Sequence, residues 1–238
     1  MVNEFPQVLT IAGSDSDGSA GMQADLHTFF IRKTYGMTVL VAAVAGNSYG
    51  IHAVETLPLS FISKQFDVLA SDFHIRASKT GMLSDADLIH TVADAYQTYD
   101  FGPLVVDPVI TTKHGAQLLE DRAFQALKTK LLPLAEVATP NFFEAQLLTG
   151  ITIETEEEQR LAAQAIQTLG AKNVIVKGWH HLAAQSEVAD YVLLADGTDF
   201  WLRHQYFETT HINGTGDTLS ATIAAELAKG TDVATAIH

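Results

Sequence analysis

The chain has 238 residues, of which 47% are hydrophobic, enough to bury the core of a single α/β domain over residues 1–238. The formal net charge of −14, from 14 basic and 28 acidic residues, argues against nucleic acid or an anionic membrane as a partner. No cysteine is present, which excludes disulfides, thiolate metal sites and cysteine nucleophiles. The N-terminus has no basic region followed by a long apolar run, and no apolar stretch approaches the roughly 20 residues of a membrane helix, so we expect a cytoplasmic protein.

Short apolar runs alternate with helical patterns along the chain. Residues 7–12 predict a buried strand that ends at Gly13, and a loop of turn-forming residues precedes a helix that begins near Met22. A second buried strand is expected at 37–45, before a break at Gly46 and Asn47. Further strands are expected at 73–79, 104–107, 136–139 and 173–177, with a hairpin of 188–194 and 200–203. Further helices are expected at 58–70, 85–99, 123–131, from 140 onward, 156–169 and from 218 to about 230.

Strands that alternate with helices predict a mostly parallel sheet with helices on both faces. In such sheets, ligands bind outside the carboxyl ends of the strands. The candidate site residues are therefore those that follow the predicted strands: Gly13, Gly46, Asn47, Thr80, Gly81, Met82, Asp107, Asn141, Glu144, Lys177, Gly178 and Gly214.

The segment Gly214-Thr215-Gly216-Asp217 leads directly into the last long predicted helix. Its glycines allow backbone conformations in which successive N–H groups point the same way. A helix N-terminus adds unpaired N–H donors and the positive end of the helix dipole, so the segment predicts an anion site. An anion cradle beside a carboxylate suits phosphoryl transfer to a hydroxyl, with Asp217 accepting the hydroxyl proton. The alternative is that the glycines only form a turn and Asp217 is an ordinary N-cap.

Asp107, Asn141 and Glu144 form a set of oxygen ligands that suits Mg²⁺, which prefers one or two carboxylates, waters and substrate phosphates. Asn141 and Glu144 are three residues apart near a predicted helix start and would share one face. The alternative is that Asn141 is a plain N-cap and Glu144 a favourable first-turn acid. Lys177 ends a predicted strand just before Gly178, where it could neutralise a phosphate or simply be solvated.

Five motifs in order give the chain a family resemblance. They are Gly-Ser-Asp-Ser at 13–16 with Ala-Gly-Met-Gln-Ala-Asp-Leu at 20–26, Lys-Thr-Gly-Met-Leu at 79–83, Val-Asp-Pro-Val at 106–109, Thr-Pro-Asn-x-x-Glu at 139–144 and Gly-Thr-Gly-Asp at 214–217. From about Val8 to its last residue, the chain resembles the ribokinase-like superfamily, and within it the branch of hydroxymethylpyrimidine kinases and pyridoxal kinases. The resemblance implies a three-layer α/β/α fold that moves the γ-phosphoryl group of Mg·ATP to a hydroxymethyl group on a heteroaromatic ring. It also allows a homodimer, because the family often dimerises.

The same resemblance implies roles for individual residues. The ring pocket is expected to contain Gly13, Asp25, Gly46, Asn47, Met82 and Val109. The metal is expected to be held by Asp107 and Glu144, and ATP by Asn141, Lys177, Gly178, Gly214 and Gly216. Asp217 is expected to be the base beneath an anion hole of Gly214, Thr215 and Gly216. Residues 110–118 are expected to form a flap that excludes water from the reacting groups.

Three departures from the branch bear on the expected function. Many members carry Cys at the position of Asp217, so this chain is expected to use a conventional carboxylate base. Pyrimidine kinases of the branch usually carry Gln at the position of Gly46, and loss of that amide favours a pyridine ring. Relatives usually continue with further helix beyond the position of His238, so the C-terminal end is expected to be short.

The expected activity is therefore that of a pyridoxal kinase, which uses ATP to phosphorylate a vitamin B6 alcohol. The alternative is a hydroxymethylpyrimidine or phosphomethylpyrimidine kinase of thiamine biosynthesis. A third hypothesis is a non-catalytic nucleotide- or vitamer-binding protein. The joint presence of Asp107, Glu144, Lys177 and Asp217 disfavours that hypothesis, because a pure binder needs no base.

Overall fold

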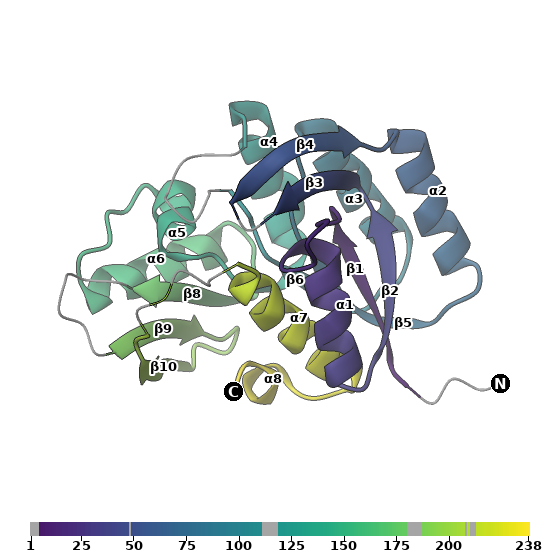
Figure 1. The fold of residues 1–238 in the computed structure, drawn as a ribbon. Helices are drawn as coiled ribbons and strands as arrows, with labels where there is room; N and C mark the ends of the chain where they lie inside the picture. Colours follow the sequence, from purple (N-terminus) through teal and green to yellow (C-terminus); the bar gives the residue numbers. More distant parts are fainter. Residues whose placement is uncertain (1–4, 48, 111–118, 180–186, 208, 210–212) are drawn as a thin grey trace.

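The computed structural model describes residues 5–47, 49–110, 119–179, 187–207, 209 and 213–238. A central sheet lies between two layers of helices (Figure 1). Its strands are β1 (Gln7–Ala12), β2 (Tyr35–Leu40), β5 (Ile75–Thr80), β6 (Leu104–Val106), β7 (Ala135–Ala138), β8 (Asn173–Trp179), β9 (Glu187–Leu193) and β10 (Asp199–Gln205). One face packs against α1 (Gly21–Ile31), α7 (Thr215–Ala228) and α8 (Val233–Ile237). The other packs against α2 (Leu59–Ala70), α3 (Ala86–Thr98), α4 (Asp121–Ala126), α5 (Phe142–Thr149) and α6 (Glu156–Thr168). The predicted three-layer α/β/α fold is confirmed.

The sheet is mostly parallel, with the strand order β10-β9-β8-β7-β6-β5-β1-β2. The neighbouring strands β8, β7, β6, β5, β1 and β2 run parallel to one another. β9 and β10 extend one edge of the sheet as an antiparallel hairpin. Interior strands are covered on both faces, and several are apolar at consecutive positions, as Val174, Ile175 and Val176 in β8 are, all fully buried. Because these strands are parallel, their carboxyl ends meet at one edge of the sheet, and the candidate residues meet there too.

The strand predicted at 37–45 is two strands in the structure. β2 pairs with β1 as far as Leu40, and after Val41 the chain enters β3 (Ala42–Asn47). β3 leaves the main sheet and pairs antiparallel with β4 (Gly50–Thr56), a strand that we did not predict. The apolar run continues through the change of direction, so hydrophobic periodicity could not mark it.

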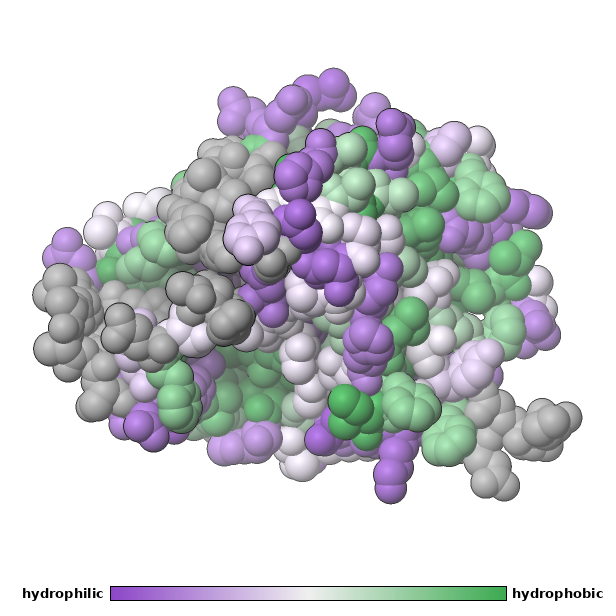
Figure 2. Space-filling view, in the orientation of Figure 1, coloured by the Kyte–Doolittle hydropathy of each residue, from purple (hydrophilic) through white to green (hydrophobic). Residues whose placement is uncertain are grey.

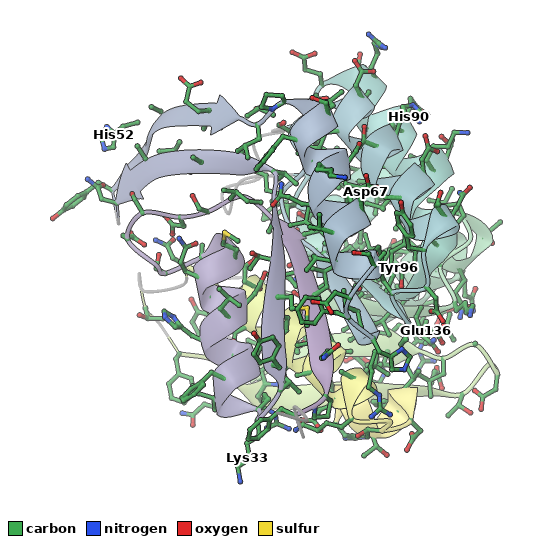
Figure 3. All side chains as sticks on the ribbon, turned by 90° about the vertical axis from the view of Figure 1, so that its right-hand side faces the viewer. Lys33, His52, Asp67, His90, Tyr96 and Glu136 are labelled. Carbon is green, nitrogen blue, oxygen red and sulfur yellow. The ribbon has the colours of Figure 1, made fainter. Side chains whose placement is uncertain are left out.

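The β3–β4 pair lies across the top of the molecule in Figure 1, close to the loop that precedes α1. The Ser14 N–H donates to the Ala42 carbonyl at 2.8 Å and joins that loop to β3. β4 is exposed along its whole length, and His52 points outward from it (Figure 3). A two-stranded pair is only marginally stable by itself. Contacts with the loop after β1 therefore help to hold it near the carboxyl edge of the sheet.

Several helix boundaries also differ from the predictions. α7 begins at Thr215 rather than near residue 218, so the glycine segment is the start of the helix itself. The helix predicted at 123–131 is α4 followed by a π-helical turn at Leu127–Leu131, and α8 was not predicted. Across the part of the chain that the structure describes, no helix has both the length and the apolar character needed to cross a membrane.

Candidate active site

The N-terminus of α7 forms the first part of the site. Gly214 occupies the capping position and has a φ of +73°. A Cβ at Gly214 would overlap the carbonyl oxygen of Ser19, in the loop before α1. Glycine is required at this position because it tolerates a positive φ and has no Cβ. The close approach joins the start of α7 to the loop that follows β1.

Asp217 lies in the first turn of α7, beyond the capping position held by Gly214. The alternative in which Asp217 is an ordinary N-cap is therefore wrong. Its carboxylate accepts a hydrogen bond from Lys79 Nζ at 3.0 Å and another from the backbone N–H of Gly21. The side chain of Asp217 is 19% exposed, so it remains reachable from the carboxyl edge of the sheet.

Charged side chains from three strands of the main sheet face this helix start. They are Lys79 on β5, Asp107 directly after β6 and Lys177 on β8. Lys177 Nζ lies 3.7 Å from Asp107 Oδ1. A Cβ on Gly216 would stand 3.2 Å from Lys177 Nζ and 3.4 Å from Asp107 Oδ2, so the first turn of α7 abuts this pair. A lysine beside a helix N-terminus is a favourable place for a phosphate group.

Lys79 is completely buried and bridges two carboxylates. Its Nζ lies 2.6 Å from Asp25 Oδ1 and 3.0 Å from Asp217 Oδ1. Burial by itself would lower the pKa of Lys79, but the charges of the two carboxylates outweigh burial and raise it. Burial would likewise raise the pKa of Asp217, yet the charge and hydrogen bond of Lys79 bring it below its ordinary value. Asp217 is therefore an ionised carboxylate at neutral pH.

Asp25, which the resemblance places in the ring pocket, forms an ion pair with Lys79 in this structure. Its side chain is fully buried, and its Oδ2 accepts a hydrogen bond from Thr10 Oγ1 at 2.5 Å. Burial raises the pKa of Asp25 while Lys79 opposes that shift, and the 2.6 Å contact is that of an ion pair. Asp25 thus supports the lysine beneath the base. We assigned no role to Lys79 from the sequence, where the only signal was a lysine opening the motif at 79–83.

The predicted metal ligands Asp107 and Glu144 lie together beside Lys177. Asn141 caps α5, since its Oδ1 accepts the Glu144 N–H at 3.0 Å and Glu144 Oε2 accepts the Asn141 N–H at 2.9 Å. Glu144 Oε1 accepts the Ile110 N–H at 2.9 Å, which ties α5 to the segment after β6. Burial and the charge of Asp107 raise the pKa of Glu144 to about 7, against the opposing charge of Lys177. The capping alternative describes these bonds correctly, and each carboxylate oxygen keeps a further lone pair for a ligand.

Two neighbouring carboxylates suit a cation that keeps waters and phosphate oxygens in its shell. Among the residues that the structure describes, no group of three or more His, Cys, Asp or Glu forms a complete metal cage. Gly178, expected to contact ATP, donates its N–H to Asp190 Oδ1 at 2.6 Å. That bond holds the bulge of β8 in which Lys177 lies, and so helps to direct the lysine towards Asp107.

The residues expected around the ring surround the loop after β1. A Cβ on Gly13 would stand 3.4 Å from Met82 Cε, so these two positions adjoin. The Gly46 N–H donates to Ser16 Oγ at 2.9 Å, and the Gly46 carbonyl accepts from the same hydroxyl at 2.6 Å. Gly46 does not have a positive φ. Asn47 ends β3, where its Oδ1 accepts the backbone N–H of a neighbouring residue.

Val109 has a φ of +45°, which marks local strain because its side chain is branched at Cβ. The next residue, Ile110, is buried, and its N–H donates to Glu144 Oε1, which fixes the backbone directly after Val109. The rest of the expected flap, residues 111–118, lies outside the described residues.

On the face shown in Figure 2, hydrophilic side chains gather at the centre, over the loop that leads into α1.

Residues 15–238 match the family model described as phosphomethylpyrimidine kinase. The hydroxymethylpyrimidine/phosphomethylpyrimidine kinase of Haemophilus influenzae is 50% identical over 237 residues, which cover 99% of this chain and 88% of that protein. The crystal structure of a phosphomethylpyrimidine kinase from Clostridium difficile has a TM-score of 0.85 at 38% identity and covers 97% of this chain and 94% of its own. The pyridoxal kinase from Staphylococcus aureus in complex with AMP-PCP and pyridoxal has a TM-score of 0.87 at 36% identity, over 98% of this chain and 84% of its own. The chain belongs to the phosphomethylpyrimidine kinase family, in the hydroxymethylpyrimidine kinase and pyridoxal kinase branch of the ribokinase-like superfamily.

Proposed function

We propose that the protein is a hydroxymethylpyrimidine/phosphomethylpyrimidine kinase that uses ATP. The observation that carries the proposal is the Asp217 carboxylate in the first turn of α7, which lies 3.0 Å from Lys79 Nζ in a fold shared with a kinase of that name. The Haemophilus influenzae relative, 50% identical over nearly the whole chain, carries the pyrimidine name. Our first expectation from the sequence, pyridoxal, has less support than the pyrimidine alternative.

In the proposed reaction, the substrate hydroxyl oxygen attacks the γ-phosphorus of ATP and ADP leaves. Asp217 accepts the hydroxyl proton, which its ionised state allows. Lys177 and the backbone N–H groups at the start of α7 stabilise the negative charge on the phosphoryl oxygens. Such reactions have a loose transition state, so positioning and charge stabilisation supply most of the rate. A carboxylate held in one place therefore suffices as the base.

Mg²⁺ is the cation that best fits the carboxylates of Asp107 and Glu144. When bound there with the triphosphate, it would neutralise phosphate charge. The two side chains come from different elements, one after β6 and one on α5. Asp107 and Lys177 both adjoin α7, where Ser220 Oγ donates to Asp107 Oδ2 at 3.4 Å. Asn141 orients the Glu144 carboxylate through the reciprocal cap, so its contribution to ATP binding is through that orientation.

Glu144→Gln should raise the Mg²⁺ concentration needed for half-maximal activity, because an amide is a poorer ligand for a hard cation. The pKa of Glu144 is about 7, so protons compete with the metal below that pH. In the parent protein, the Mg²⁺ requirement should therefore fall as the pH rises through 7, and in Glu144→Gln this dependence should be weaker, because only the protonation of ATP still contributes to it. Mg²⁺ titrations of the initial rate at several pH values measure both effects.

Glu158→Gln is the matched control, because Glu158 lies in the first turn of α6 and accepts hydrogen bonds from Glu154 N–H and Thr155 Oγ1 near the cap. Its Mg²⁺ dependence should equal that of the parent. If Glu144→Gln also kept the parent's Mg²⁺ dependence at every pH, Glu144 would be a capping residue only.

Pyridoxal remains the second candidate substrate, and a specific residue favours it. Gly46 offers no side chain to pair with a pyrimidine edge, and the Staphylococcus aureus pyridoxal kinase shares the fold. A substrate panel of hydroxymethylpyrimidine, its monophosphate, pyridoxal, pyridoxine and pyridoxamine, followed by mass spectrometry, tests the proposal. We expect the highest kcat/KM with the pyrimidines. A higher kcat/KM for any B6 vitamer would establish the second candidate instead.

Gly46→Gln should shift the ratio of kcat/KM for pyrimidine over pyridoxal towards the pyrimidine by roughly tenfold, about the value of one hydrogen bond. The substitution is sterically tolerable, because Gly46 lacks a positive φ and its Cβ would stand 3.2 Å from the Gly50 carbonyl oxygen, a contact that a small shift relieves. Measuring both substrates on one variant separates pairing from strain. Strain would lower both rates equally and leave the ratio unchanged, which would remove residue 46 from the specificity set.

A further inference from the structure

Lys79 is an unusual residue to find inside a sheet. It lies in β5 with a fully buried side chain, and its neighbours on the same strand, Ser78 and Thr80, are also fully buried. An ammonium group loses much solvation in such a place, and an apolar side chain in place of a buried ion pair often costs nothing in stability. The stability of the fold therefore does not by itself explain why a lysine stands there.

The contacts of Lys79 form a chain that leads from the core to the site. Thr10 Oγ1 on β1 donates a hydrogen bond to Asp25 Oδ2 at 2.5 Å. Asp25 Oδ1 accepts a hydrogen bond from Lys79 Nζ at 2.6 Å. Lys79 Nζ then donates to Asp217 Oδ1 at 3.0 Å. Asp25 and Lys79 are completely buried, whereas the Asp217 side chain is 19% exposed. Of these three charged side chains, Asp217, the proposed base, is the one that solvent reaches.

Lys79 is the charged group that donates a side-chain hydrogen bond to Asp217, whose carboxylate also accepts the backbone N–H of Gly21. The charged residues that act on the cluster are Asp25 from α1, Asp107 after β6 and Lys177 on β8. Lys177 is 3.7 Å from Asp107 and faces the first turn of α7, where a phosphate is expected. The Lys79 side chain extends from β5 towards α7, and its Nζ donates a hydrogen bond to Asp217 Oδ1 at 3.0 Å.

We propose that Lys79 is a positioning residue for phosphoryl transfer, which holds the Asp217 carboxylate in one orientation beneath the glycine segment and is itself anchored by Asp25. The proposal rests on the function proposed above. Lys79 does not touch the substrate, because it is fully buried. Its effect is on the chemical step: a base displaced by as little as 1 Å can lose roughly 10²-fold in rate.

The competing explanation is that Lys79 only neutralises the buried Asp25. A double variant distinguishes the two. Lys79→Met alone leaves Asp25 and Asp217 as close, uncompensated carboxylates, and we expect both a lower Tm and a lower kcat. Lys79→Met with Asp25→Asn removes one positive and one negative charge together, so the buried charge imbalance disappears. We expect its Tm to return towards that of the parent.

The kinetics of the double variant test the proposal. If Lys79 positions Asp217, kcat should stay at least about tenfold below the parent while the KM values for ATP and the alcohol are unchanged. A double variant that regained both the Tm and the kcat of the parent would overturn the proposal. A loss that appeared as a higher KM for the alcohol with normal kcat would also overturn it, and would return Asp25 to the ring pocket.

Lys172→Met is the matched control, because Lys172 pairs with Glu136 at 2.7 Å on the surface and its side chain is 64% exposed. The Tm of Lys172→Met should differ from that of the parent only slightly, because an exposed ion pair contributes little to stability. Its kcat should equal that of the parent. The activity of the parent protein, measured in the same assay, distinguishes failure of the proposed function from failure of the proposed role of Lys79. A parent inactive on every alcohol rejects the proposed function, whereas equal kcat for an active parent and the double variant rejects the role of Lys79 alone.

Discussion

Asp217→Asn is expected to lower kcat by at least ~10² while leaving ATP affinity nearly unchanged, because it removes the proton acceptor and keeps the shape of the side chain. The fold should tolerate the change. Lys79 keeps Asp25 as a partner at 2.6 Å, so the substitution leaves a balanced ion pair in the core. Initial rates with saturating substrates and calorimetric titration with ATP measure the two expectations.

Asp85→Asn is the matched control for this substitution. Asp85 caps α3 through a hydrogen bond from the Leu88 N–H at 2.9 Å, and Asn caps a helix about as well as Asp. The Asp85→Asn variant should keep the parent's rate and stability. An Asp217→Asn variant with a rate close to the parent would show that the carboxylate at 217 is not the base.

Gly214→Ala is expected to damage stability and activity together. An L-residue in the left-handed region costs roughly 1–2 kcal/mol, and here the methyl group would also overlap the Ser19 carbonyl oxygen. Relief of an overlap by backbone shifts typically costs a further ~1–3 kcal/mol. The shift would move the first turn of α7, which carries Asp217, and kcat should fall by roughly 10² or more.

Gly150→Ala separates the overlap from the backbone conformation. Gly150 has a φ of +74°, nearly that of Gly214, but a Cβ there would have nothing within 4 Å. Gly150→Ala should therefore show only the conformational cost, with kcat unchanged. Thermal denaturation of both variants gives the difference in Tm. Equal Tm and equal rates for the two variants would mean that the contact between Gly214 and Ser19 does not matter to the site.

The features that the sequence predicted correctly are local ones. Apolar runs and helical periods repeat within a few residues, so the α/β class and the order of the elements followed from them, apart from β4, α8 and the division of β2 from β3. The alternative in which Asn141 is an N-cap and Glu144 a first-turn acid is confirmed as a local feature, and the structure adds the return bond from Asn141 N–H to Glu144 that the sequence analysis did not predict. The segment from Gly214 to Asp217 indicated a helix start because glycine before an amphipathic run is a local signal.

The chain's departure from the main sheet at Val41 was not predictable in this way. β2 and β3 are both apolar, and only the end of the pairing with β1 at Leu40 separates them. Hydrophobic periodicity records burial and not which strand lies alongside. Contacts with the loop after β1, such as the hydrogen bond from Ser14 N–H to the Ala42 carbonyl, help to hold β3 in its place, and these partners lie far from β3 in the sequence.

The support of the base also depends on tertiary structure alone. The sequence identified Asp217 through its own surroundings and gave no role to Lys79, whose partners Asp25 and Asp217 lie 54 and 138 positions away. α1 and α7 pack side by side on the same face of the sheet, and that packing brings one carboxylate from each helix to the lysine on β5. A residue's own neighbours in sequence determine its helix or strand, but the partner of a buried charge is determined by which elements the core packs together.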